Sequence, residues 1–313
     1  MASPFVFANS KLSRRGFLGA TGIVAATTAL AACSSDSDSD SSSNAASTTS
    51  NEEERRVVVL NTGQLDNMLM LGILPVGTAK AKNSDVVPQF IRDRFGGEYD
   101  LDSITDCGVR ANPDLEVIAS LNPTLICANS RTDEAILAQL KEIAPVITGS
   151  GGGENWKEDL LTIADGVGME AKAQSLLDEY TATASELAGE FGADAPTVSF
   201  LRTKDDAFQL YGVQSMAGIV ASDCGLPRPD NQQFDDSASI DLSAEQLGEA
   251  DADWLFYGVG DGGADPSTTS VWPALNAVAN GQAVQVDYEA WYMNASLLSA
   301  QIIRDGLREH ILG

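Results

Sequence analysis

From Arg56 onward, short runs of consecutive apolar residues alternate with stretches that have helical periodicity. Such βαβ alternation predicts parallel sheets covered by helices on both faces, and continuous runs indicate strands that are buried on both sides. We therefore expect an α/β fold. The runs that predict strands cover residues 57–60, 75–77, 125–128, 145–147, 197–201, 208–211, 254–257 and 283–286.

The interval between Pro145 and Pro196 contains no proline, and apolar residues recur within it every three or four positions. This pattern predicts one long amphipathic helix over residues 171–192, about 33 Å long at ~1.5 Å per residue. A glycine closes the helix, and the second proline prevents its continuation. The helix separates an N-terminal lobe, residues 55–170, from a C-terminal lobe, residues 193–313.

The first 33 residues have the layout of an export signal. Three basic side chains and no acidic one precede sixteen uncharged residues, Phe17 to Ala32, which end at Cys33. The segment 13–18 looks like the twin-arginine signal, and Leu30-Ala31-Ala32-Cys33 resembles the lipobox, whose cysteine is lipid-modified. A chance arginine pair before an ordinary secretion signal is the alternative.

Residues 34–54 contain nine serines and no aromatic residue. This composition cannot bury enough apolar surface to fold, so we expect a flexible tether. The folded part then begins near Arg55. The mature protein is expected to be exported and held by a lipid on Cys33 at the outer face of the cytoplasmic membrane.

The chain carries 45 acidic and 19 basic side chains, a formal net charge of −26. This charge opposes binding to phosphate backbones and to anionic lipid surfaces, so neither nucleic acid nor a membrane surface is an expected partner. The lone histidine, His310, excludes His-rich zinc sites and most Ser-His-Asp chemistry. The sequence also lacks a Gly-x-Ser-x-Gly elbow, which disfavours a secreted hydrolase.

Three cysteines follow the export signal: Cys107, Cys127 and Cys224. They permit at most one disulfide, and any two of them are candidates for it. Because no regular spacing indicates a disulfide framework, buried thiols are favoured over a bridge.

Two glutamates stand at matching places in the two halves of the chain. Glu116 and Glu245 are 129 residues apart, and each lies two residues after an Asp or Ser that can cap a helix. A glutamate in a first helical turn complements the helix dipole without any partner, which suffices to explain either one alone. Their matching positions indicate two similar lobes with equivalent surface carboxylates.

Several stretches occur in an order and spacing that are together distinctive: 56–75 (which ends Met70-Leu71-Gly72-Ile73-Leu74-Pro75), 108–129, 144–146, 156–180, 210–227, 242–257 and 272–291. In these stretches the chain resembles the substrate-binding lipoproteins of ABC importers for ferric siderophores, cobalamin and haem. It is most similar to the ferrichrome and ferric-citrate type receptors. The resemblance implies two Rossmann-like lobes with parallel sheets, joined by one rigid backbone helix, with the ligand in a cleft between the lobes.

The resemblance also implies a function and partners. The protein is expected to be a monomeric binding protein rather than an enzyme, which captures a ferric siderophore or a ferric-citrate-like chelate and delivers it to an ABC permease. No resident cofactor or metal is expected, since the iron arrives within the ligand. In this family one glutamate per lobe docks onto arginines of the permease, a role that falls here on Glu116 and Glu245.

Loops at the carboxyl ends of the parallel strands should border the cleft, because ligands of open parallel sheets bind there. Arg110, Arg131 and Arg202 occupy such loops in a chain that is poor in basic residues. Their forked guanidinium groups suit the carboxylate, catecholate or hydroxamate oxygens around a coordinated iron. The alternative is that each arginine pairs with a nearby acid.

Trp156, Tyr211, Trp291 and Tyr292 are candidates for an apolar wall of the cleft, since ligand sites combine aromatic surface with a few polar groups. Aromatic side chains also fill cores, which is the alternative for each of them. The glycine run at 149–153 is not a phosphate loop, because no Lys-Ser/Thr follows it. We interpret it as a flexible approach to the ligand.

Other ligands stay open at this point. A bare metal ion would need an all-carboxylate site, since His310 lies outside every expected cleft loop. Haem would need a tyrosine ligand, for which Tyr257 or Tyr288 is available. Cobalamin is compatible with the same transport role.

Overall fold

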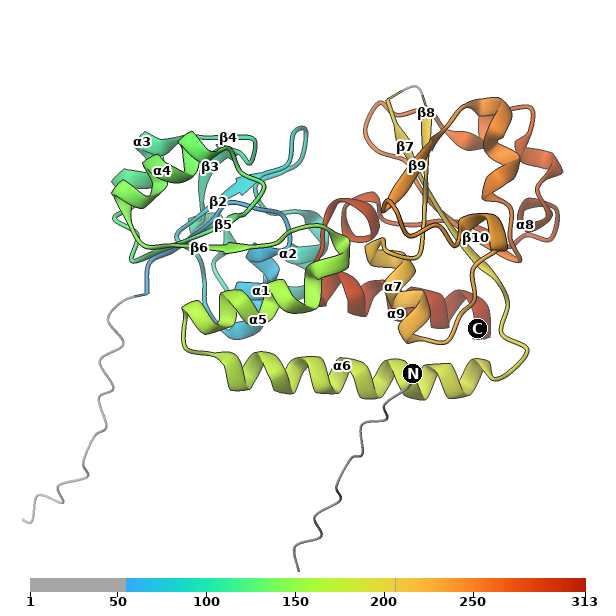
Figure 1. The fold of residues 1–313 in the computed structure, drawn as a ribbon, viewed down its shortest axis with the longest axis horizontal. Helices are drawn as coiled ribbons and strands as arrows, with labels where there is room; N and C mark the ends of the chain where they lie inside the picture. The colour runs from blue at the N-terminus through green and yellow to red at the C-terminus, as the bar shows by residue number, and fades with distance from the viewer. Residues whose placement is uncertain (1–54, 206) are drawn as a thin grey trace, which may run out of the picture. The chain divides into compact units, whose positions relative to one another are not determined.

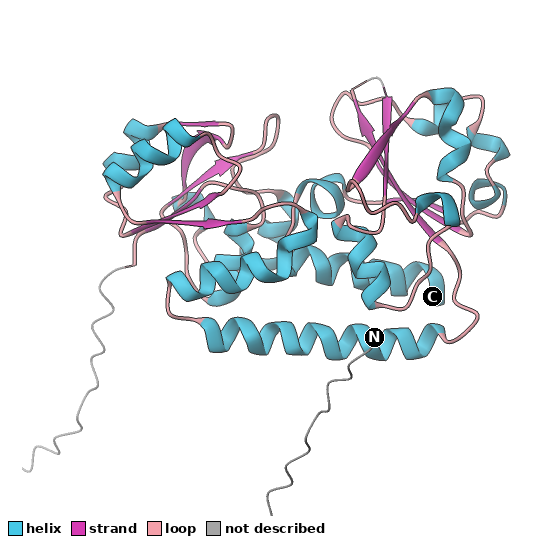
Figure 2. Ribbon diagram, in the orientation of Figure 1, coloured by secondary structure: helices cyan, strands magenta, loops and turns pink. Residues whose placement is uncertain are grey.

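The computed structural model describes residues 55–205 and 207–313 (Figure 1). The predicted export signal, its lipobox residue Cys33 and the predicted tether lie outside the described residues. The described part contains two sheets and numerous helices (Figure 2), so the expected two-lobed α/β fold is confirmed. Within these ranges, no helix combines the length and the hydrophobicity needed to cross a membrane.

The N-terminal lobe is built on a six-stranded sheet of order β4-β3-β2-β1-β5-β6. Neighbouring strands are parallel, except that the short edge strand β4 pairs antiparallel with β3. The strands are β1 (Val57–Val59), β2 (Gly77–Lys80), β3 (Thr105–Val109), β4 (Asn112–Pro113), β5 (Leu125–Asn129) and β6 (Val146–Gly149). The helices are α1 (Gln64–Leu71), α2 (Gln89–Phe95), η1 (Leu101–Ser103), α3 (Leu115–Ser120), α4 (Glu134–Ile143), η2 (Gly153–Asn155) and α5 (Trp156–Gly166).

The C-terminal lobe contains a five-stranded sheet of order β11-β10-β7-β8-β9. It departs from the expected parallel pattern, because β8 and β9 run antiparallel to their neighbours. The connection between β7 and β8 is too short for a crossover, and a short connection forces an antiparallel pair. The strands are β7 (Val198–Lys204), β8 (Ala207–Tyr211), β9 (Ser239–Leu242), β10 (Trp254–Gly258) and β11 (Ala283–Gln285). The helices are α7 (Met216–Asp223), η3 (Asp230–Gln232), η4 (Ala244–Ala250), η5 (Pro266–Thr268), η6 (Trp272–Ala274), α8 (Asn276–Ala279), η7 (Glu289–Met293) and α9 (Leu297–Leu312).

The long helix α6 (Glu170–Phe191) starts and ends one residue before the predicted span of 171–192. It contacts α5 of the first lobe and α7 of the second, and α9 packs beside it. Helix α9 also contacts α1, α5 and α7, so the last helix of the chain touches both lobes (Figure 1). The side chains that α6 buries recur at helical spacing: Ala173, Leu177, Tyr180, Ala184 and Leu187.

One apolar core runs through both lobes and through the helices between them. It includes Val57 of the first sheet, Phe200 of the second, Leu187 of α6 and Ile303 of α9. Because apolar burial contributes roughly 25 cal/mol per Å², a shared core opposes wide separation of the lobes. The two lobes therefore stay packed together at the base of the cleft.

The backbones of α1 and of the segment before α9 approach closely at Gly63. Its φ is +90°, and a Cβ at this position would lie 2.1 Å from the carbonyl oxygen of Ala295. Both observations require glycine. This contact fixes the start of α1, which follows the cleft-lining segment 60–62, against the start of α9.

The three described cysteines, Cys107, Cys127 and Cys224, are buried free thiols. Burial raises the pKa of each thiol to about 12. They are therefore protonated and unreactive at neutral pH.

Candidate ligand-binding cleft

A cleft of about 660 Å³ lies between the two lobes. The first lobe contributes the loops that follow β1, β3 and β5, which are the carboxyl ends of parallel strands. The second lobe contributes β7, β8, the start of α7 and the segment from η7 to α9. Of the residues predicted for the site, those that line this cleft are Arg110, Arg131, Arg202, Tyr211, Trp291 and Tyr292.

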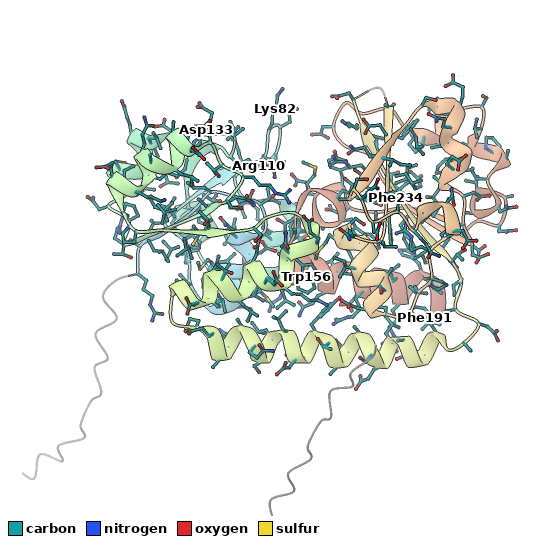
Figure 3. All side chains as sticks on the ribbon, in the orientation of Figure 1. Lys82, Arg110, Asp133, Trp156, Phe191 and Phe234 are labelled. Carbon is teal, nitrogen blue, oxygen red and sulfur yellow. The ribbon has the colours of Figure 1, made fainter. Side chains whose placement is uncertain are left out.

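Arg110 lines the cleft from the loop after β3 (Figure 3). Its Nη1 donates a 2.9 Å hydrogen bond to Thr62 Oγ1. Partial burial between the cleft walls, and then repulsion from Arg202, lower the pKa of Arg110 below its ordinary value. No carboxylate pairs with the guanidinium of Arg110 in the described part of the chain.

Arg202 faces the cleft from β7 of the other lobe and is held by a neutral amide. Gln209 Oε1 accepts hydrogen bonds from Arg202 Nε (2.9 Å) and Nη2 (2.5 Å). Gln209 Nε2 in turn donates to Asp241 Oδ1 (2.9 Å), and Asp241 is paired with Lys204 (3.1 Å). Lys204 therefore neutralises the carboxylate of Asp241, and Arg202 keeps its positive charge.

Aromatic rings also surround Arg202. The guanidinium carbon lies 5.6 Å from the ring centroid of Tyr211 and 5.9 Å from that of Tyr288. Nη1 contacts the sulfur of Met293 at 2.8 Å. Ring faces attract a cation without neutralising it, so these contacts orient the arginine and leave it available to an anion.

Arg131 pairs with a nearby acid, which is the alternative that the sequence left open for each of the three arginines. Its Nη2 forms a 2.8 Å ion pair with Glu154 Oε1 of the same lobe, and its backbone N–H donates to Asn129 Oδ1. An arginine already paired with a carboxylate attracts a second anion less strongly. Arg131 lines the cleft but contributes less positive charge to it than Arg110 or Arg202.

The three cleft aromatics, Tyr211, Trp291 and Tyr292, come from the second lobe, and the two tyrosines lie side by side. The rings of Tyr211 and Tyr292 have centroids 5.4 Å apart, and Tyr292 Oη donates to the carbonyl oxygen of Phe256 (2.8 Å). Trp291 is stacked on Phe256 with centroids 5.3 Å apart and is only 4% exposed. Trp291 therefore supports the wall and presents little of its ring to the cleft.

The prediction that Trp156 lines the cleft is wrong. It is 1% exposed and does not line the cleft. Its ring packs edge-on against Tyr180 of α6, with centroids 5.1 Å apart. As the first residue of α5, Trp156 faces the helix packed beneath it, and it belongs to the core.

The glycine run is anchored rather than free. Asp159 accepts hydrogen bonds from the backbone N–H groups of Ser150 (2.7 Å) and Gly151 (2.8 Å) through its two carboxylate oxygens. Gly151 and Gly152 have φ values of +69° and +86°, which other residues adopt only with strain. Gly152 and Gly153 then line the cleft, so the run forms a fixed part of its wall.

Several cleft residues escaped the sequence analysis. Gln209 lies on β8 between the buried side chains of Phe208 and Leu210, and this alternation marks it as outward-facing. Asn61 lies two residues after Val59, the last residue of β1, at a strand end that itself signals the cleft. Met293 and Asn294 directly follow Tyr292, the last residue of the chain that was predicted for the site.

Glu116 and Glu245 lie on the surface and outside the cleft lining. Glu116 is in the first turn of α3, whose N-cap Asp114 accepts from the N–H groups of residues 116 and 117. Glu245 is in the first turn of the 3₁₀-helix η4, which begins with a Ser243/Gln246 capping box. Its own backbone N–H and Ser243 donate to the Glu245 carboxylate and lower its pKa.

Comparisons with known proteins agree on one family. The family described as periplasmic binding protein matches residues 57–290. The chain is 32% identical over 241 residues to the Fe(3+)-citrate-binding protein YfmC of Bacillus subtilis, a match that covers 75% of this chain and 73% of that one. It is 28% identical over 271 residues to the probable siderophore-binding lipoprotein YfiY of the same organism, with 82% of each chain covered. Staphylococcus aureus SirA complexed with staphyloferrin B has a TM-score of 0.71 at 25% identity, covering 82% of this chain and 93% of that one.

Proposed function

Because the chain belongs to the periplasmic binding protein family, we propose that it captures a ferric siderophore or a ferric-citrate-like chelate outside the cytoplasm and delivers it to an ABC permease. The similarity to an Fe(3+)-citrate-binding protein and to a structure holding staphyloferrin B supports this ligand class. The iron enters as part of the ligand, so this role needs no resident cofactor and no catalysis.

One observation carries the proposal: Arg110 and Arg202 come from opposite lobes, line the same cleft and have no carboxylate partner in the described part of the chain. Their charges stand out in a protein with a net charge of −26. Guanidinium groups bind carboxylate oxygens through paired, charge-assisted hydrogen bonds. The ligand that fits best is therefore a negatively charged ferric chelate with carboxylate oxygens.

Haem and cobalamin are less well supported as ligands. Tyr257 packs edge-on against Trp272, with centroids 4.8 Å apart, and does not line the cleft. Tyr288 lies beside Arg202, and its Oη donates to the carbonyl oxygen of Thr203 (3.5 Å). Neither tyrosine lines the cleft, so neither is placed to serve as an axial ligand for haem iron.

The proposal includes the two partners expected of such a protein. Glu116 and Glu245 dock onto the two permease subunits, and a lipid on Cys33 holds the protein at the outer face of the membrane. Both glutamates are exposed in first helical turns, where a carboxylate is stabilised by the helix dipole. Matched charge pairs would set the docking register and speed encounter more than they raise affinity.

A tryptophan-fluorescence titration tests the ligand class. Trp291 borders the cleft, so a chelate bound beside Arg202 should change its emission. We expect saturable binding of ferric citrate or another anionic ferric chelate, with iron-free citrate as the control. Calorimetry with haem and cobalamin provides the comparison. Tight binding of either of these, without binding of any ferric chelate, would refute the proposal.

A further inference from the structure

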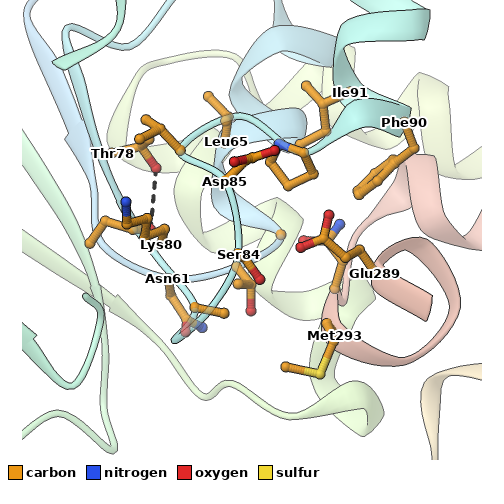
Figure 4. Close-up of a pocket in the computed structure, with 17 residues that line it drawn as sticks. Asn61, Leu65, Thr78, Lys80, Ser84, Asp85, Phe90, Ile91, Glu289 and Met293 are labelled. Atoms are coloured by element: carbon orange, nitrogen blue, oxygen red, sulfur yellow. Dashed lines mark hydrogen bonds between the residues drawn. The ribbon is translucent and has the colours of Figure 1, made fainter. Parts of the chain in front are cut away.

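A second, smaller pocket opens beside the cleft (Figure 4). It lies between the loop after β2 and the start of α2 in the first lobe, and η7 in the second. Its volume is about 30 Å³, enough for a terminal group of one or two heavy atoms. The residues that line both this pocket and the cleft are Asn61, Thr62, Met293 and Asn294. An extended ligand in the cleft can therefore reach the pocket.

Two carboxylates from opposite lobes line this pocket, one of them on the exposed residue Asp85. Figure 4 shows Asp85, from the loop after β2, and Glu289, from η7, both directed into the space between them. Glu289 is half-buried, and burial raises its pKa; a hydrogen bond from Ser84 opposes this rise, and repulsion from Asp287, Asp85 and Asp261 adds to it. The walls around the two acids are mostly apolar and include Leu65, Val86, Phe90, Ile91 and Met293.

The negative charge of the pocket is uncompensated. Lys80 is the basic residue that lines it, and Lys80 Nζ is already paired with Asp106 Oδ2 at 2.8 Å. Neither Asp85 nor Glu289 forms an ion pair within the described residues. The neighbouring cleft has the opposite character, since Arg110 and Arg202 supply unpaired positive charge there.

We propose that this pocket binds a protonated primary amine at the end of an aliphatic arm of the ferric chelate. The inference rests on the proposed function. An ammonium group is compact and has three donors, so it fits a small space between two carboxylates, and the apolar walls cover the methylene groups that carry it. A metal ion fits less well, because the described residues contain no group of three or more acidic, His or Cys side chains able to hold one. The preferred ligand is then zwitterionic, with its oxygens towards the arginines and its amine towards Asp85 and Glu289.

The test compares two chelates that differ only at the amine. Citrate amidated at one terminal carboxyl with 1,5-diaminopentane is offered as its ferric complex, and so is the same compound with its free amine acetylated. Acetylation removes the charge and keeps the iron-binding oxygens. We expect the wild-type protein to bind the free-amine chelate at least about tenfold more tightly, the size of a charge-assisted hydrogen bond.

The variants Asp85→Asn and Glu289→Gln should each reduce this preference, and the double variant should bring the affinity ratio close to one. Asp261→Asn is the matched control, because it removes a nearby charge that does not line the pocket. Equal affinity of the wild type for the two chelates overturns the inference. So does binding of ferric citrate without either amidated chelate, which leaves the proposed function intact. Binding of no ferric chelate at all overturns both.

Discussion

Arg202 and Gln209 face each other across the β7–β8 pair, and the glutamine amide oxygen accepts two hydrogen bonds from the guanidinium, from Nε at 2.9 Å and from Nη2 at 2.5 Å. A carboxylate in the same place would form a bidentate ion pair and neutralise the arginine. The amide of Gln209 orients the guanidinium in the same way and adds no negative charge. Gln209 therefore keeps Arg202 oriented and positive.

The variant Gln209→Glu should weaken binding of an anionic ferric chelate by about tenfold or more, because Arg202 would then be paired internally. Binding of an uncharged ferric trihydroxamate should change much less. Calorimetric titration of both chelates gives the two affinities. Since Gln209 Nε2 donates to Asp241, the double variant Gln209→Glu/Asp241→Asn controls for repulsion between the two acids. Unchanged affinity for the anionic chelate in both variants would show that the residue at 209 does not set the charge of Arg202.

The three cleft arginines should differ in importance. Arg110→Ala and Arg202→Ala should each cost roughly 1.5 to 3 kcal/mol of chelate binding, since each removes a charge-assisted hydrogen bond. Arg131→Ala should cost less, because Arg131 is already paired with Glu154 at 2.8 Å. Affinities of the three variants for one anionic ferric chelate check the order, with circular dichroism to confirm folding. A largest loss at Arg131 would contradict this assignment.

Permease docking is tested by reversing charge on both lobes. Glu116→Arg with Glu245→Arg should leave chelate affinity unchanged and abolish cellular iron uptake, while either single change is milder. Glu170→Arg is the matched control, because Glu170 is also an exposed glutamate in the first turn of a helix. Uptake and affinity measured on the same variants separate docking from folding. Normal uptake by the double variant would mean that the two glutamates only stabilise their helices.

Strands β1, β5 and β6 of the first lobe, the long helix and most of the cleft follow from patterns that a single sequence contains, whereas β3 and β4 and the strand order do not. Apolar runs mark buried strands, and the ends of parallel strands mark the cleft, which is how Arg110 and Arg202 can be located. The pairing of Arg202 with Gln209 can also be predicted from the sequence. Two strands separated by a very short connection form a hairpin, and its register pairs residue 202 with residue 209.

Trp156 shows what the sequence alone does not determine. Helical periodicity identifies α5 but not which element covers its first turn, and the covering residue, Tyr180, lies on another helix. The same limit applies to Arg131, whose partner Glu154 is 23 residues away in the 3₁₀-helix η2. Which of many acids in an acidic chain meets a given arginine depends on tertiary packing.

A buried carboxylate joins the two lobes below the cleft. Asp66 of α1 is 0% exposed, and its Oδ2 accepts from Asn294 Nδ2 (3.0 Å) and from the hydroxyl of Ser296, the N-cap of α9. Its Oδ1 has no partner among the described residues. Burial raises the pKa of Asp66 from its ordinary 3.8 to about 6, and the hydrogen bonds from Ser296, Asn294 and the backbone only partly oppose this.

The sign of the resulting pH dependence follows from linkage. Because the folded protein holds this proton more tightly than the unfolded chain, the free energy of unfolding should fall as pH rises from about 4 to about 6, by at most about 3 kcal/mol from this group. Asp66→Asn mimics the protonated acid and removes the effect. The stability of Asp66→Asn relative to wild type should therefore increase between pH 4 and pH 7, as measured by urea unfolding. Titrations of the other acids cancel in this difference, so a difference that stays constant with pH would show that Asp66 does not carry the raised pKa.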